Sequence, residues 1–289
     1  EPSAVDRVLT EAAGNPALVE MLQGVNATIG NLINQGGNRD FKVTSTGQVT
    51  VQDSLSLSAD QIGRNLYVNL SGAGGLVVNG KIYDTFHSAG LTNNPGTLRK
   101  AGTGTMTLNG DSSYASLTTV EGGTLVIGHA NALGVASPTN GTTLTGNATL
   151  DFNGFTIGET LAINNSGNKL VNSSASAAAV TADANVNAPL TVDTTGDLTT
   201  ARLICSAPSK VITKTGAGTL TTAGNNHNNL AAWQINAGTV VFANTSGYGA
   251  DRGVTIDGGT LRLSGANFNL INDGQGFTLN SGVFDLNGK

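Results

Sequence analysis

Short segments of this chain alternate strictly between apolar and polar residues. In residues 123–127, Leu125 and Ile127 fall on one side of the segment, whereas Thr124 and Val126 fall on the other. Successive side chains of a β-strand point to opposite faces, so this pattern predicts a strand with an aliphatic inner face and a more polar outer face. The glycine before the strand suits a bend in which a larger side chain would crowd the backbone.

The same glycine–threonine segment recurs at a nearly constant interval. Five close copies begin at Gly104, Gly123, Gly218, Gly238 and Gly259, and two looser copies begin at Ala148 and Gly282. The interval runs from 19 residues (Gly104 to Gly123) to 23 residues (Gly259 to Gly282). A unit of this period cannot bury its own apolar face, so the copies must stack. The sequence therefore predicts an all-β fold, a parallel β-helix (β-solenoid) of about twelve coils over residues 41–289.

Several copies end in an Asn-Gly pair, at residues 79–80, 109–110, 153–154 and 287–288. Both residue types tolerate positive φ, so each pair is expected to turn the chain sharply. Asn-Gly also favours two-residue hairpins, which leaves an antiparallel meander as the structural alternative. The longer, irregular stretches that follow these pairs favour corners of a coil.

A longer period is also visible. Residues 98–107 resemble residues 212–221, an offset of 114 positions, and each segment leads into a Gly-Thr strand copy. This similarity indicates the duplication of a block of several coils.

Residues 1–40 lack the strand pattern and are expected to form a helical cap or docking segment. Ser3 with Asp6 resembles a capping box that opens a helix through Ala13, and Asn15-Pro16 repeats the start signal. An apolar stripe at helical spacing follows, at Leu18, Leu22, Val25, Ile29 and Leu32, before Gly36-Gly37. The helices are expected to cover the open edge of the first coil, or alternatively to dock onto another subunit.

Residues 287–289 stop at a corner where a further coil is expected to begin, and no terminal cap is recognisable. We expect either a longer protein or a partner that covers the last coil. If the partner is a second copy, head-to-tail contacts of this kind propagate into a filament.

Composition and charge exclude several kinds of partner and a disulfide framework for this chain. Charged residues make up 11% of the chain, against about 25% in an ordinary soluble domain, and 40 residues are glycine. A net charge of −5 gives no attraction to nucleic acid or to an anionic membrane. No run of hydrophobic residues approaches the length of a membrane-spanning helix. The single cysteine, Cys205, excludes an intrachain disulfide framework and is expected to be a buried strand residue.

Four segments together resemble a known repeat. Residues 100–108 with 121–125, and residues 214–221 with 236–240, resemble the autotransporter-associated β-strand repeat of bacterial passenger domains. The resemblance implies a right-handed β-helix that is exported to the extracellular space or the cell surface of a bacterium. It says little about activity, because fold does not imply function.

Parallel β-helices also include polysaccharide lyases and glycosidases, so the carboxylates and histidines of this chain are candidate catalytic residues. Asp151 and Asp285 occupy corresponding strand positions expected to point outward, and Asp257 precedes a glycine pair. Two carboxylates facing one cleft are needed for glycoside hydrolysis, and sequence alone does not bring these together. The histidines are His87, His129 and His227, all in expected loops without metal-ligand spacing. We therefore expect no catalytic, cofactor-binding or metal-binding residue, and no cofactor.

Threonines of the repeats are expected to share the outer face of a sheet. They are Thr105, Thr124, Thr149, Thr219, Thr239 and Thr260. Threonine is a good strand former, and a hydroxyl ladder also suits a glycan, an ordered surface or a neighbouring rod.

We expect a non-enzymatic structural or adhesive surface protein that associates head to tail or with other surface components. The alternatives are a glycan-binding or glycan-degrading β-helix and a passenger fragment of a larger adhesin.

Overall fold

The computed structural model describes residues 5–9, 19–21, 26–34, 38–43, 46–58, 63–84, 96–136, 141–225, 230–266 and 270–288. Within these ranges every regular element is a β-strand, and the strands pair in parallel. The predicted parallel β-solenoid is confirmed, the antiparallel meander is wrong, and the handedness stays a prediction. The chain divides into two compact units, Glu1–Thr143 with Ala148–Leu150, and Leu144–Asn147 with Asp151–Lys289.

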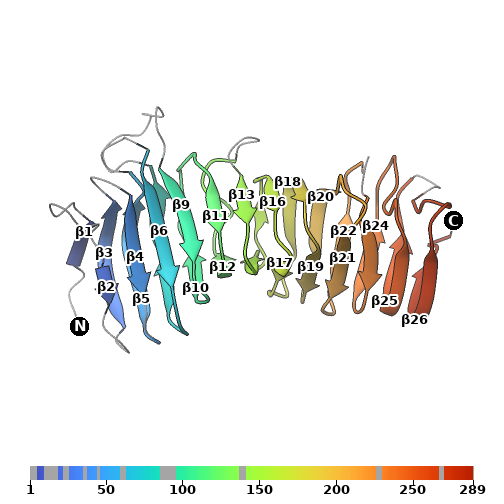
Figure 1. Ribbon diagram of the computed structural model, residues 1–289, viewed down its shortest axis with the longest axis horizontal. Helices are drawn as coiled ribbons and strands as arrows, with labels where there is room; N and C mark the ends of the chain where they lie inside the picture. The colour runs from blue at the N-terminus through green and yellow to red at the C-terminus, as the bar shows by residue number, and fades with distance from the viewer. Residues whose placement is uncertain are drawn as a thin grey trace. The chain divides into compact units, whose positions relative to one another are not determined.

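The strands of the first unit follow one another coil by coil and lie side by side in Figure 1. They are β1 (Val5–Leu9), β2 (Val19–Met21), β3 (Ala27–Asn34), β4 (Arg39–Val43), β5 (Gln48–Ser56), β6 (Asn65–Leu70), β7 (Gly75–Val78), β8 (Lys81–Tyr83), β9 (Thr97–Ala101), β10 (Thr105–Leu108), β11 (Thr118–Val120) and β12 (Gly123–Ile127). Strands β13 (Thr142–Leu144) and β14 (Ala148–Asp151) fall where the two units divide.

The second unit repeats this organisation. Its strands are β15 (Thr156–Ile157), β16 (Leu161–Ile163), β17 (Asn168–Asn172), β18 (Ala178–Val186), β19 (Leu190–Thr194), β20 (Leu198–Ile204), β21 (Val211–Thr215), β22 (Thr219–Thr222), β23 (Ala232–Ile235), β24 (Thr239–Phe242), β25 (Val254–Leu263) and β26 (Phe277–Asp285).

Aliphatic residues stack in register inside each unit. In the first unit Val51 pairs with Val78, Val78 with Leu108, and Leu108 with Ile127, and all four are at most 1% exposed. Burial of apolar surface at successive coils supplies the main favourable free energy, while parallel hydrogen bonds satisfy the backbone. The period-two alternation of the sequence is therefore confirmed as an inside–outside pattern.

The solenoid has about ten turns rather than the twelve predicted. The prediction assumed a uniform period of about 21 residues. The coil from Val51 to Val78 spans 27 residues, and the coil from Val78 to Leu108 spans 30. Loops inserted between strands lengthen these coils without changing the register of the core.

The helices predicted in residues 1–40 are wrong wherever the structure describes that segment, because β1, β2, β3 and β4 are strands. The register shifts between Ile29 and Asn31, and this irregularity turns both Ile29 and Leu32 inward. In a regular strand, residues three apart face opposite sides. The irregular strand thus imitates the apolar spacing of a helix. The remaining parts of the predicted helices, including Ser3 and Asn15-Pro16, lie outside the described residues.

No helix long and apolar enough to cross a bilayer occurs in the part of the chain that the structure describes.

Candidate functional site

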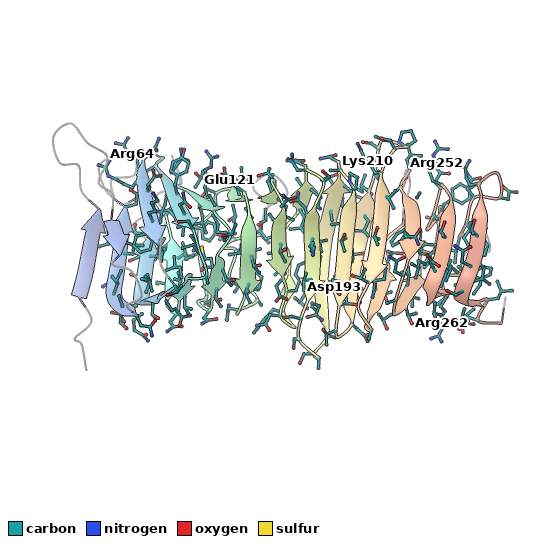
Figure 2. All side chains as sticks on the ribbon, turned by 60° about the horizontal axis from the view of Figure 1, so that its bottom comes forward. Arg64, Glu121, Asp193, Lys210, Arg252 and Arg262 are labelled. Carbon is teal, nitrogen blue, oxygen red and sulfur yellow. The ribbon has the colours of Figure 1, made fainter. Side chains whose placement is uncertain are left out.

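Charged side chains such as Arg64, Lys210 and Arg262 lie at the outside of the coils in Figure 2. Lys100 of β9 is an exception, because it is fully buried. Its Nζ donates to the carbonyl oxygens of Gly102 at 2.9 Å and Gly122 at 2.6 Å, one on its own coil and one on the next. Gly123 adopts a φ of +61°, and a Cβ there would lie 2.5 Å from this Nζ. The ammonium group therefore holds two successive glycine corners together.

Lys214 of β21 repeats this arrangement in the second unit. It is also fully buried, and its Nζ donates to the carbonyl oxygens of Thr215, Gly216 and, at 3.4 Å, Ala237 on the next coil. Burial lowers the pKa of both lysines to about 8. We call each set of lysine and carbonyl groups a lysine clamp. The duplication seen in the sequence is thus also a duplication of a buried polar contact.

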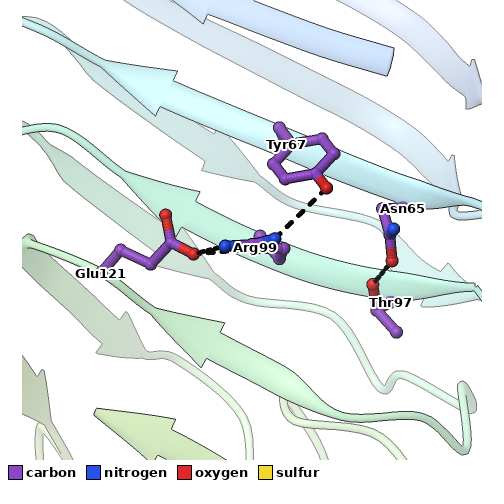
Figure 3. Close-up of polar contacts among 5 residues, drawn as sticks. All are labelled: Asn65, Tyr67, Thr97, Arg99 and Glu121. Carbon is purple, nitrogen blue, oxygen red and sulfur yellow. Dashed lines mark hydrogen bonds and ion pairs between the residues drawn. The ribbon is translucent and has the colours of Figure 1, made fainter. Parts of the chain in front are cut away.

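A polar cluster lies on the outer face of β6 and β9. Arg99 donates through Nη1 to the Tyr67 hydroxyl at 3.2 Å and through Nε to Glu121 Oε1 at 2.8 Å (Figure 3). Its guanidinium carbon lies 4.7 Å from the centre of the Tyr67 ring. Thr97 donates to the side-chain oxygen of Asn65 beside this cluster. These groups satisfy one another across neighbouring coils, so we assign the cluster a structural role.

The first unit also has an open polar groove of about 610 Å³. It is lined by Asp53, Asn79, Lys81, Asn109, Gly110, Asp111, Ser112, Ser113 and His129. Successive coils contribute these residues at the loops that follow β7, β10 and β12, together with Asp53 of β5 and Lys81 of β8. We call this feature the corner groove.

An amide ladder includes two of the lining residues, Asn79 and Asn109. Asn109 donates to the side-chain oxygen of Asn79 at 3.0 Å, and Asn79 donates to Gln52 at 3.1 Å. Gly80 and Gly110 keep successive corners close, because a Cβ at Gly80 would lie 1.8 Å from the Asp53 carbonyl oxygen. Two of the Asn-Gly pairs in the sequence therefore line up along the coil axis.

The groove lining also includes a carboxylate, Asp111, and an imidazole, His129. Asp111 accepts a hydrogen bond from the Asn131 amide at 2.8 Å and lies 3.9 Å from His129 Nδ1. The backbone N–H of Asn131 donates to the same Nδ1 at 3.1 Å. Nδ1 therefore acts as an acceptor, which places the proton of the neutral imidazole on Nε2. His129 therefore offers a donor, Nε2–H, to the groove.

The carboxylates considered in the sequence do not assemble into a site. Asp151 was expected to point outward, but it is 8% exposed and accepts hydrogen bonds from Asn153 and Ser173. This prediction was wrong because the strand alternation ends at Asp151, where the chain bends. Asp285 pairs with Arg262 at 2.7 Å, which lowers the pKa of Asp285, and Asp257 is exposed.

The histidine and cysteine predictions have different outcomes. His129 lines the corner groove, whereas His87 and His227 lie outside the described residues. Cys205 is buried, as predicted. In the described part of the chain, no three His, Cys, Asp or Glu side chains gather closely enough to hold a metal ion.

The predicted threonine ladder is confirmed in part. Thr219, Thr239 and Thr260 pair in register in the second unit, and Thr105 pairs with Thr124 in the first. The corner groove, in contrast, was missed, because Asp53, Lys81 and Asp111 are far apart in sequence. The usable signal was the pair of Asn-Gly corners at residues 79–80 and 109–110, each with a charged residue directly after it.

Glu159, between β15 and β16, is another buried residue with an ionisable side chain. It is 3% exposed, and its Oε1 has no hydrogen-bond partner among the described residues. Burial raises the pKa of this carboxyl to about 8. Because the folded protein retains a proton that the unfolded chain has lost, Glu159 makes the second unit less stable as pH rises.

We expect the free energy of unfolding of the second unit to fall between pH 4.5 and pH 8, the ordinary and folded pKa values. The loss should be a few kcal/mol and should be complete once the pH exceeds the folded pKa. Urea unfolding at pH 5 and pH 8.5 measures it. Glu159→Gln should flatten the dependence, and an unchanged pH slope in this variant would contradict the assignment.

The segments that match a known protein family coincide with the two lysine clamps. A family model described as the passenger-associated-transport-repeat matches residues 98–127 and 212–242. One match lies in each unit, and each contains one of the buried lysines. No curated protein and no solved structure matched the chain.

Proposed function

Because the chain carries two passenger-associated-transport-repeats on a parallel β-solenoid, we propose that it is part of an exported bacterial autotransporter passenger. In this proposal the protein is displayed outside the cell and serves as a non-enzymatic structural or adhesive surface. The observation that carries the proposal is the pair of family matches, each of which contains the same lysine clamp.

The character of the outer surface supports this role. Charged residues are 11% of the chain, and threonines stack in register on the outer face. Such a surface presents hydroxyl and amide groups at the strand spacing of about 4.8 Å. Such a surface suits repeated weak contacts to a polar partner better than contacts to an apolar partner.

Surface display is tested on the native host cell. An epitope inserted after Gly72, at an exposed turn, should be reached by antibody on intact cells, and external protease should remove it. A deletion strain should attach less to a polar surface, with attachment restored by the gene. Antibody access only after the cells are broken would refute surface display.

End-to-end self-association is a finer proposal, favoured by the outer side of β26. This strand pairs with β25 on one side only within the described residues. Its apolar residues Phe277, Leu279 and Val283 are 39%, 50% and 51% exposed. We propose that a strand of a second copy pairs with this edge and covers these side chains.

Light scattering over a concentration series tests the association. The wild-type chain should form species larger than its 29.0 kDa as concentration rises, and Leu279→Lys with Val283→Lys should remain monomeric. Leu117→Lys, an exposed apolar position in the first unit, is the matched control and should associate like the wild type. A monomer at every concentration would exclude this proposal.

A further inference from the structure

We propose that the corner groove of the first unit binds a neutral linear glycan, whose hydroxyl groups contact Asp53, Lys81 and Asp111. The proposal rests on the proposed function only for the setting in which such a glycan is met, because the binding itself is a property of the folded chain. Residues 109–113 of the groove lie inside the first repeat match, whereas Asp53, Asn79, Lys81 and His129 lie outside both matches.

Free hydrogen-bonding capacity is the first reason. Asp53 is exposed and has no hydrogen-bond or ion-pair partner among the described residues. Lys81 contacts only the face of the Tyr83 ring, at 5.6 Å, and has no carboxylate partner in the same described part. A carboxylate accepts from two neighbouring hydroxyls and an ammonium donates to others, so these groups suit a polyhydroxylated ligand.

The position of these groups along the groove is the second reason. The lining residues come from successive coils, since Val51 pairs with Val78 and Val78 with Leu108. Coils are spaced by about 4.8 Å, so the groove offers a repeated set of polar groups over roughly 10–15 Å. The amide ladder of Gln52, Asn79 and Asn109 runs in the same direction. A linear chain of sugar units fits this repeat better than a compact ligand does.

The charges and residue types of the lining favour an uncharged, hydroxyl-rich ligand over other ligand classes. Two carboxylates face the groove with one lysine, so a polyanion would be repelled at Asp53 and Asp111. None of the lining residues is a large apolar side chain, which disfavours a lipid or an apolar peptide. His129 adds a donor through Nε2, because Nδ1 already accepts from the backbone N–H of Asn131. The class of ligand that fits this lining is uncharged and rich in hydroxyl groups.

Calorimetric titration of the purified full chain tests the proposal. The probes are three neutral linear hexaoses, built from β-1,4-glucose, β-1,3-glucose and β-1,4-mannose, with a heparin oligosaccharide as the charged comparison. We expect saturable binding of at least one neutral hexaose and none of heparin. Asp53→Asn combined with Asp111→Asn should weaken the binding about tenfold or more, equivalent to about 1.4 kcal/mol.

Two further variants separate a site from a general effect on the fold. Lys81→Met should also weaken binding, whereas Asp257→Asn, an exposed carboxylate of the second unit, should bind like the wild type. Circular dichroism checks that each variant is folded. Unchanged affinity in the Asp53/Asp111 variant, binding of heparin alone, or no binding of any hexaose would each overturn the proposal.

The outcome of the hexaose titration is independent of the outcome of the surface-display test. A chain that is displayed on the cell but does not bind the hexaoses would leave the proposed function standing and refute the groove. A chain that binds the hexaoses but stays inside the cell would do the reverse.

Discussion

Replacing Lys100 or Lys214 by methionine is expected to lower the free energy of unfolding of its own unit by about 2–3 kcal/mol. Methionine has a similar length and is apolar, so the cavity is filled. The half-buried carbonyl oxygens that the ammonium group now binds on two successive coils lose this donor. Denaturant unfolding followed by segment-resolved hydrogen exchange measures the loss.

The two variants serve as controls for each other. Lys100→Met should reduce protection around residues 98–127, and Lys214→Met around residues 212–242. Lys169→Met, at an exposed position of β17, should change stability by less than about 0.5 kcal/mol. If both buried variants are as stable as the wild type, the clamps do not hold the coils together.

Trp233→Ala is expected to cost about 3–5 kcal/mol in the second unit. Trp233 is the largest of the fully buried side chains and is 1% exposed. It pairs in register with Ile212 and Val254 and makes an edge-to-face contact with Phe242 at 5.3 Å between ring centres. Removing the indole opens a cavity across three successive coils, which the rigid stack fills only in part.

Trp233→Phe is the matched variant for this experiment. The indole Nε1 is buried and has no hydrogen-bond partner among the described residues, so its removal sacrifices no hydrogen bond. We expect a loss of only about 1–2 kcal/mol, from the smaller ring. Thermal unfolding by circular dichroism compares both variants with the wild type. If the phenylalanine and alanine variants lose the same free energy of unfolding, the volume of the buried ring does not explain the importance of this position.

The strand content of residues 97–128 and 212–263 follows directly from the sequence. Alternation such as Leu125 and Ile127 inside, Thr124 outside, is local and needs only the period-two geometry of a strand. The register of the threonine ladder followed as well, because equal intervals between repeats bring like residues to like positions. The two lysines were visible in the duplicated segments, but their burial was not, since a lysine is ordinarily exposed.

The error in residues 1–40 has a specific cause. Ile29 and Leu32 have the spacing of a helical stripe, and only the pairing of β3 with β5 reveals the irregular strand. Helix capping residues and apolar spacing are local signals, and long-range pairing overrides them. The outward prediction for Asp151 failed similarly, because a bend ended the alternation at that residue.

What the sequence determined by itself is the repeating coil, because backbone geometry ties a period of about twenty residues and an alternating pattern to a stack of parallel strands. What only the tertiary structure decided is which polar groups meet. Lys100 reaches Gly122 because β9 and β11 pair in adjacent coils. Asp53, Lys81 and Asp111 share a groove because coils of 27 and 30 residues bring them to one corner. No local periodicity encodes these contacts, because each of them joins residues of different coils.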